Sequence, residues 1–202
     1  MYINSALNEY LNDLAARKPA PGGGSAAALE AAMGCALMSM VANFTISNKN
    51  YEQFKERAES SLKRSEEFRK RFTEHIDEDV LAYTKLSEGF KKYDRDSPEL
   101  GRLFKASCAV PYELCQMISD ALTLCKGLVE FGNKRLVTDT AIAALMLESA
   151  FFGAKFNVYI NLKYIKDKEY ASTIRKTFSE LDKKIPRLKE EVLHASQDII
   201  LK

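Results

Sequence analysis

The sequence predicts an all-α protein, built as a bundle of long antiparallel helices with buried central helices. Apolar residues recur at helical spacing through most of the 202 residues. The most apolar segments are too long and too rich in alanine to be β-strands. Only nine glycines and five prolines interrupt the chain, and no linker or internal repeat divides it. We therefore expect one helical domain over residues 1–202.

Helix-breaking residues and the apolar periodicity place the helices along the chain. A first short helix over residues 3–16 ends before a loop that contains Pro19 and Pro21. Ser25 can cap the next helix, and Pro98 suits the first position of a later one. After the first helix, the expected ranges are 25–47, 50–92, 98–131 with a bend at Pro111, 138–165, and 169–201, where Pro186 can interrupt the helix.

The composition excludes some classes of partner and site. With 30 Lys plus Arg and 28 Asp plus Glu, the net charge of +2 argues against nucleic acid as the main partner. We see no apolar stretch typical of a signal peptide or a membrane span, so we expect a cytoplasmic protein with no membrane partner. The four cysteines lack CxxC spacing and only two histidines are present. We therefore expect reduced, buried thiols and no metal site.

The segments over residues 25–47 and 138–165 are both apolar nearly all round. Two such helices are many for a chain of this length, and a single copy of a simple bundle would expose part of their surface. We therefore expect a homo-oligomer that covers this surface. The alternative is a large, well-packed monomeric core.

Three consecutive glycines, Gly22 to Gly24, lie between Pro21 and Ser25, directly before the first of these apolar helices. Their backbone N–H groups are unobstructed by Cβ atoms and meet the positive end of the helix dipole. The segment could therefore bind an anion or a polar ligand. It is not a Walker loop, because Lys-Ser/Thr does not follow the glycines. A tight turn that precedes a helix explains the glycines equally well.

Asp79 lies on the apolar stripe of the long helix, three residues after Ile76 and four before Tyr83. A carboxyl that faces a core loses hydration, which raises its pKa and makes it a plausible proton donor near neutral pH. A buried aspartate satisfied by a neighbouring cation or amide is the structural alternative. Asp77 points about 200° away around the helix, so the two carboxyls need not share a site.

Asn157 and Asn161 lie one helical turn apart on a line of small residues that also includes Asp139. Two amides at this spacing could recognise the donors and acceptors of a ligand, or they could join two helices. Asp139 and Asn157 are separated by about 27 Å along a straight helix. They would therefore serve different ends of a long ligand, or one would reach across an interface.

Several segments together resemble the cyclodeaminase/cyclohydrolase family. This is the all-helical domain of formiminotransferase-cyclodeaminase, which also occurs as a stand-alone methenyltetrahydrofolate cyclohydrolase. The segments that carry the resemblance span most of the chain: Ala20-Pro-Gly-Gly-Gly-Ser-Ala-Ala-Ala-Leu29, Ser39-Met-Val-Ala-Asn-Phe-Thr45, Ile76-Asp-Glu-Asp-Val-Leu-Ala-Tyr83, Ala109-Val-Pro111, Gly132-Asn133, Asp139 and Gly153-Ala-Lys-Phe-Asn-Val-Tyr-Ile-Asn-Leu-Lys163. Two departures are Thr138 in place of a serine and a charged stretch ending at Ser97-Pro98 in place of a Leu-Pro-Lys element.

The resemblance implies an α-helical homodimer, or a dimer-based oligomer, that acts on one-carbon adducts of tetrahydrofolate. The implied activity is that of a methenyltetrahydrofolate cyclohydrolase or a formiminotetrahydrofolate cyclodeaminase, with no cofactor beyond the folate substrate. Asp79 would be the proton donor, and Asp139 would stabilise a cationic centre. The substrate-binding residues implied are Pro21, Gly22, Gly23, Gly24, Ser25, Asn43, Asn133, Thr138, Asn157 and Asn161. The alternative from another class is a non-catalytic helical oligomerisation module on the same scaffold.

Overall fold

A computed structural model describes residues 1–202 and is all-α, as the sequence predicts. The α-helices are Leu7–Ala15 (α1), Gly23–Ile46 (α2), Lys55–Lys92 (α3), Pro98–Phe131 (α4), Val137–Leu162 (α5) and Lys168–Ile200 (α6). Short 3-10 helices span Tyr2–Asn4 (η1), Lys49–Phe54 (η2) and Lys134–Leu136 (η3).

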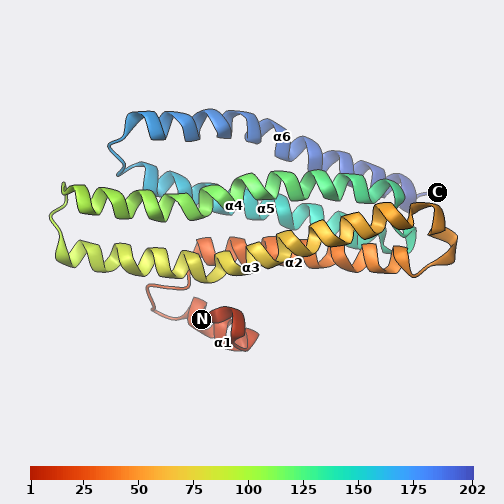
Figure 1. Ribbon diagram of the computed structural model, residues 1–202, viewed down its shortest axis with the longest axis horizontal. Helices are drawn as coiled ribbons and strands as arrows, with labels where there is room; N and C mark the ends of the chain where they lie inside the picture. The colour runs from red at the N-terminus through yellow and green to blue at the C-terminus, as the bar shows by residue number, and fades with distance from the viewer.

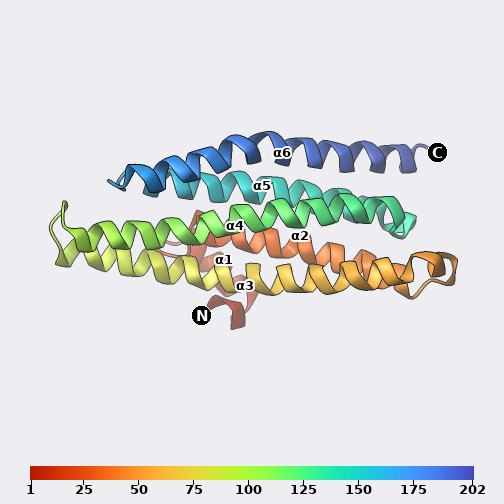
Figure 2. The same ribbon diagram turned by 45° about the horizontal axis from the view of Figure 1, so that its top comes forward.

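The long helices α2 to α6 run along a common axis (Figures 1 and 2). The short α1 lies outside this set of helices (Figure 1) and contacts it through the buried Tyr10. Short connections at opposite ends of the molecule join α3 to α4 and α4 to α5, so these neighbours run in opposite directions (Figure 1). The two most apolar helices are in mutual contact: α2 packs between α3 and α5, and α5 also packs against α4 and α6. The start of α2 and the end of α5 therefore lie at the same end of the bundle.

Most of the observed helix boundaries agree with the expected ranges to within three residues. The first helix, expected from residue 3, begins at Leu7, and Tyr2–Asn4 form a separate 3-10 turn. The helix expected from residue 50 begins at Lys55, because residues 49–54 form a 3-10 turn in which Tyr51 has non-helical angles (φ −115°, ψ 16°). The N-cap of α2 is Gly22 rather than Ser25, and it supplies no side-chain cap. The last helix, α6, continues through Pro186 without interruption.

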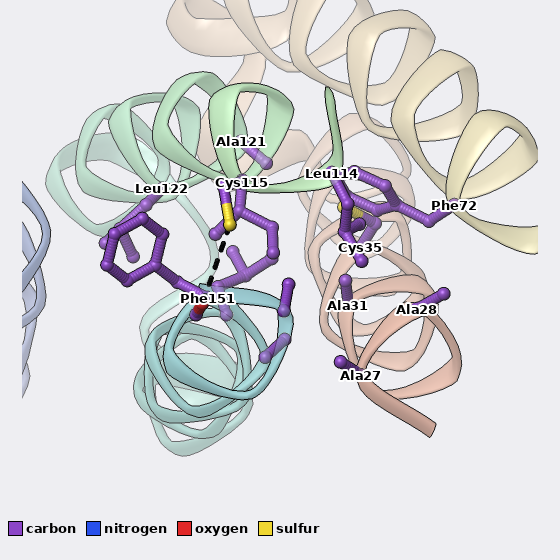
Figure 3. Packing of buried hydrophobic residues seen from close by; sticks show 14 of the residues in the cluster. Ala27, Ala28, Ala31, Cys35, Phe72, Leu114, Cys115, Ala121, Leu122 and Phe151 are labelled. Atoms are coloured by element: carbon purple, nitrogen blue, oxygen red, sulfur yellow. Dashed lines mark hydrogen bonds between the residues drawn. The ribbon is translucent and has the colours of Figure 1, made fainter. Parts of the chain in front are cut away.

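The core is built from mostly small residues on α2 and from apolar residues of α3, α4, α5 and α6. Figure 3 shows part of it, where alanines and Cys35 of α2 face Phe72 of α3 and Leu114 of α4. A Cβ on Gly34 would lie 3.2 Å from the carbonyl oxygen of Ala143, so this glycine permits close packing of α2 against α5. All four cysteines are free and buried, as predicted, and burial raises the pKa of each thiol. The Sγ of Cys115, for example, donates to the carbonyl oxygen of Phe151 at 3.7 Å (Figure 3).

By length and composition alone, α2 and the segment 134–162 are apolar enough to cross a membrane. A helix that is apolar on every face can equally be a core helix, and most of the apolar window of α2 is buried inside the bundle. The outward side of α2 and α5 nevertheless leaves large apolar side chains exposed. They are Met33, Phe44, Ile142, Leu145, Phe156 and Ile160.

Candidate functional site

A cavity of about 330 Å³ lies at the end of the bundle where α2 begins and α5 ends. It opens between the loop before α2, the middle of α3, the first half of α4 and the last turns of α5. Six residues singled out from the sequence line it together. They are Gly22, Gly23, Gly24, Asp79, Asn157 and Asn161.

The first turn of α2 packs directly on the carboxyl of Asp79. The N–H of Ser25 has no acceptor within the helix, since the first backbone bond of α2 runs from Ala26 to Gly22. It lies beside the carboxylate of Asp79, whose charged form it stabilises. A Cβ on Gly24 would lie 2.1 Å from Oδ1 of Asp79, closer than any side-chain atom can be. Gly24 is therefore required by the approach of α2 to α3.

The environment of Asp79 raises the pKa of its carboxyl to about 6. Burial has the larger effect, because it removes water from the charged form. The hydrogen bond from the Ser25 amide opposes burial by stabilising the carboxylate. An aspartate with this pKa can exchange a proton with a ligand close to neutral pH.

Asn157 and Asn161 line the wall of the cavity opposite Asp79's helix. Nδ2 of Asn157 donates to the carbonyl oxygen of Gly153 at 2.9 Å, and Nδ2 of Asn161 donates to that of Asn157 at 2.8 Å. A longer bond of 3.4 Å joins Nδ2 of Asn161 to the carbonyl oxygen of Ser107 on α4. The two Oδ1 atoms have no hydrogen-bond partner within the protein. They can accept hydrogen bonds from the N–H or O–H groups of a ligand.

An aromatic wall, which sequence reasoning missed, closes the other side of the cavity. The rings of Phe104 and Tyr164 are stacked with centroids 4.9 Å apart, and Phe90 packs edge-on against Phe104 at 5.7 Å. Phe90 and Tyr83 lie on the same stripe of α3 as Asp79, so the helical periodicity could have placed them here. Phe104 and Tyr164 come from α4 and the end of α5, and nothing in their local sequence marks them.

Four of the expected site residues lie at the opposite end of the bundle. Asn43 is about 30 Å from Gly23 along α2, and Asn133, Thr138 and Asp139 lie around the start of α5. One chain therefore does not bring these four positions to Asp79, which agrees with the separation of Asp139 and Asn157 expected from their spacing. Asn43 lies near the C-terminal end of α2, and Thr138 and Asp139 lie at the N-terminal end of α5. The cavity is lined by the opposite ends of these two helices.

Asn133 has a structural role at that far end. It is buried, its Oδ1 accepts from the N–H of Arg135, and its Nδ2 donates to the carbonyl oxygen of Phe44 at 3.4 Å. Its own N–H donates to Oγ1 of Thr45 at 2.9 Å. These contacts join the end of α2 to the connection between α4 and α5.

Two further expectations need correction near the cavity itself. Pro21 is buried and does not line the cavity. Ser25 is fully buried, and its Oγ lies 3.1 Å from the hydroxyl of Tyr10 rather than in the cavity. Both side chains therefore face the protein interior, because the first turn of α2 presents its glycines to the cavity and turns the following side chain inward.

Comparison with known proteins relates the whole chain to a group of folate enzymes. A family model described as formiminotransferase-cyclodeaminase matches residues 6–180. A methenyltetrahydrofolate cyclohydrolase from Methylorubrum extorquens is 31% identical over 175 residues, which cover 83% of this chain and 84% of that protein. A rat formimidoyltransferase-cyclodeaminase is 30% identical over 186 residues, and the match covers 89% of this chain but only 34% of the longer protein.

The structural comparison extends over nearly the entire chain. The crystal structure of a formiminotetrahydrofolate cyclodeaminase from Thermotoga maritima superposes with a TM-score of 0.93 at 32% sequence identity. The superposition covers 99% of this chain and 100% of the other. The helical arrangement described above is thus shared in full with a solved structure.

Proposed function

The chain belongs to the formiminotransferase-cyclodeaminase family, and we propose that it is an enzyme that acts on the one-carbon adduct of a tetrahydrofolate. Its relatives include both a cyclohydrolase and cyclodeaminases. The observation that carries the proposal is Asp79: one carboxyl with a pKa of about 6, in a cavity with two amide acceptors and an aromatic wall.

The cavity suits the chemistry of a folate adduct. The aromatic wall of Phe90, Phe104 and Tyr164 offers flat apolar contact to a ring. The Oδ1 atoms of Asn157 and Asn161 can accept from the N–H groups of a pterin. Shape and hydrogen bonding together would fix the one-carbon unit relative to Asp79.

For hydrolysis, the substrate is already activated. The bridging carbon of methenyltetrahydrofolate is part of a cationic amidinium, so a water molecule can attack it directly. Asp79 in its carboxylate form takes the proton that the attacking water loses, and the ring then opens to the formyl product. General base catalysis of this kind typically contributes about 10²- to 10⁴-fold.

For cyclodeamination, the same residue works from its protonated form. The anilino nitrogen of formiminotetrahydrofolate attacks the formimino carbon, and the amino group must leave as ammonia. Asp79 protonates this departing nitrogen, and the ring closes to methenyltetrahydrofolate. A carboxyl with a pKa near 6 is partly protonated at neutral pH, which an ordinary aspartate is not.

Neither reaction requires a metal ion or a redox cofactor, because the electrophile is supplied by the substrate. The cavity brings together neutral groups and one carboxyl, and we propose that the folate is the only small molecule needed. Activity should accordingly be the same before and after dialysis against a chelator. We also propose that the protein is located in the cytoplasm, where such substrates would be met.

One pair of assays tests the function. Purified protein is mixed with methenyltetrahydrofolate in one cuvette and with formiminotetrahydrofolate in another, and the methenyl absorbance is followed. Loss of the absorbance above the buffer rate identifies a cyclohydrolase, and its appearance identifies a cyclodeaminase. If neither signal changes and no folate binds, the chain is not a folate enzyme.

We also propose that a second copy of the chain covers the outward face of α2 and α5. Met33, Ile142, Leu145 and Phe156 on this face are 43%, 47%, 44% and 72% exposed. Two adjacent helices of this length, with axes about 9 Å apart, present a face on the order of 700 Å². A stable interface buries about 600–1,000 Å² per partner, so the face is within the range of one.

A dimer through this face also offers a role to the residues at the far end. With a two-fold axis across the middle of α2, the end that carries Asn43 and Asp139 in one copy would lie beside the cavity end of the other. Asn43 and Asp139 of one copy could then act together with Asp79 and Asn157 of the other, although the two ends of α2 within one chain are about 30 Å apart. This is the across-interface arrangement that the spacing of Asp139 and Asn157 suggests.

A further inference from the structure

A buried pair of hydroxyl groups lies behind the cavity, on the side away from the ligand. The hydroxyl of Tyr10 is 3.1 Å from Oγ of Ser25. Tyr10 is 4% exposed and Ser25 is fully buried. Tyr10 is the one buried residue of α1, whose neighbouring leucines Leu7 and Leu11 are 61% and 47% exposed. The contact of α1 with the site is therefore concentrated in this tyrosine.

Ser25 connects Tyr10 to Asp79. Its side chain pairs with the hydroxyl of Tyr10. It follows Gly24, whose Cβ position lies 2.1 Å from Oδ1 of Asp79, and its backbone N–H stabilises the carboxylate. The N–H groups of this first turn are not held by the helix ladder, so a movement of Ser25 toward or away from Tyr10 changes the position of its N–H relative to Asp79.

The segment that carries Tyr10 is itself fixed to the helix that carries Asp79. The carboxylate of Asp77 accepts from the N–H of Tyr2 at 2.7 Å and from that of Ile3 at 3.4 Å. The ring of Tyr2 then packs edge-on against the ring of Tyr10, with centroids 5.4 Å apart. Asp77 thus holds the N-terminal segment, and the segment holds Tyr10 against Ser25.

We propose that Tyr10 is a positioning residue, which keeps the first turn of α2 in place so that the Ser25 amide stays on the carboxyl of Asp79. This inference rests on the proposed function, since it assumes that Asp79 is the group that transfers the proton. The titratable groups near Asp79 are Tyr10, Tyr83 and Tyr164, and α4 and α5 present the neutral side chains Ser107, Asn157 and Asn161.

Loss of the Tyr10 hydroxyl has a defined consequence. Ser25 would lose its side-chain partner, the first turn of α2 would loosen, and its amide would donate less well to Asp79. Because that bond stabilises the charged form, the pKa of the Asp79 carboxyl would rise. The limb of the pH–rate profile that reports Asp79 should move to higher pH, whether Asp79 acts as a base or as an acid.

The test compares Tyr10→Phe, Ser25→Ala and the double variant with the unmodified protein. The carboxyl resonance of Asp79 is titrated by carbon-detected NMR, and kcat and KM are measured across pH. Each single variant should raise the Asp79 midpoint by about 0.5 units. On the sloping limb of the pH profile, kcat should change by about threefold with little change in KM, downward if Asp79 acts as a base and upward if it acts as an acid. The double variant should match the single ones, because both remove the same bond.

Tyr2→Phe is the matched control. It removes the hydroxyl that donates to Asp13 at 2.7 Å on the same segment but leaves the Tyr10–Ser25 pair intact. It should leave the Asp79 midpoint and the pH–rate profile unchanged.

The inference is overturned if Tyr10→Phe folds, lowers the thermal midpoint, and leaves both the Asp79 midpoint and the pH profile as in the unmodified protein. Additive effects of Tyr10→Phe and Ser25→Ala would overturn it as well. The NMR titration needs no turnover, so it decides the role of Tyr10 even if the protein converts neither folate. Lack of activity in the unmodified protein would count against the proposed function alone.

Discussion

Asp79 is subject to two opposed effects that together set its proton affinity. Burial among apolar residues of α3, α4 and α5 disfavours the carboxylate, whereas the amide of Ser25 and the positive end of α2 favour it. Burial has the larger effect, so the pKa of the carboxyl stays raised at about 6. Between the ordinary aspartate pKa near 4 and this value, the folded protein binds a proton that the unfolded chain has released. Stability therefore falls as the pH rises through that window.

Asp79→Asn should reduce activity and increase stability at the same time. We expect a rate loss of at least about tenfold, because the proton-transfer group is removed. The free energy of unfolding at pH 7.5 should rise by about 1–2 kcal/mol, and the gain should disappear below about pH 4. Denaturant unfolding at several pH values, beside the folate assays, measures both effects.

Glu88→Gln is the control for that substitution, because it removes an exposed carboxyl from the same helix and touches no part of the cavity. Glu88→Gln should change neither the reaction rate nor the free energy of unfolding. An Asp79→Asn protein with full activity would remove Asp79 from the mechanism.

At the scale of the elements, the site depends on how closely the start of α2 approaches the middle of α3. Gly24 sets this distance, since a Cβ there would overlap the carboxyl of Asp79. Asn157 lies on the other side of the same turn, where a Cβ on Gly23 would meet its Nδ2 at 3.6 Å, an ordinary contact. The three glycines are therefore unequal: only Gly24 is sterically required.

Gly24→Ala should separate α2 from α3 and disable the site. We expect a loss of at least about 1–3 kcal/mol in unfolding free energy, as for overpacked sites generally. Activity should fall at least about tenfold, since catalytic geometry tolerates little displacement. Thermal unfolding and the folate assays provide the two measurements.

Gly127→Ala on α4 is the matched control, because a Cβ there meets nothing within 4 Å. It should leave activity unchanged and stabilise the helix by up to about 1 kcal/mol. If the Gly24→Ala protein has the stability and the reaction rate of the unmodified protein, the close approach of α2 to α3 is not needed.

At the scale of the molecule, the two most apolar helices have one face in the core and one face in solvent. The buried face of α2 consists mostly of small residues, with Met38 and Val41 in its second half, and it packs on α3 and α5. The outward face carries larger side chains, and its area is close to that of a standard dimer interface. A single copy leaves that face uncovered, which is unusual for a monomer.

We expect the protein to elute with a mass of at least twice its 22.8 kDa. Leu145→Lys places a charge in the middle of the outward face and should shift the mass toward that of one chain. Activity should fall with it, because the far ends of the helices would no longer lie beside the cavity of another copy. Light scattering after size exclusion, followed by the folate assays, checks both.

Leu81→Lys introduces the same charge at an exposed leucine of α3, away from this face, and should leave the mass unaltered. A fully active Leu145→Lys monomer would show that one chain holds the complete site. An unchanged mass in that variant would place the interface elsewhere.

Local rules in the sequence were enough to place the helices and to single out Asp79. Apolar periodicity, Pro98 and the glycine turn act within a few residues along the chain, so the helical ranges came out close to those observed. The same periodicity placed Asp79 on an apolar stripe before any contact was known. The start expected at residue 50 was wrong because the 3-10 turn over 49–54 depends on contacts such as that of the Tyr51 hydroxyl with the N–H of Lys134.

The tertiary structure decided which residues meet. Asn157 faces Gly23 because α5 ends where α2 begins, and Asn133 and Asp139 are remote because they lie at the other end of the same helices. Tyr10 reaches Ser25 only because the backbone of the N-terminal segment is bound by Asp77, 75 residues later in the chain. Such contacts depend on packing between distant segments, and helical periodicity carries no information about them. The sequence by itself determined the helices and the position of Asp79 on an apolar stripe, and packing determined the cavity around that residue.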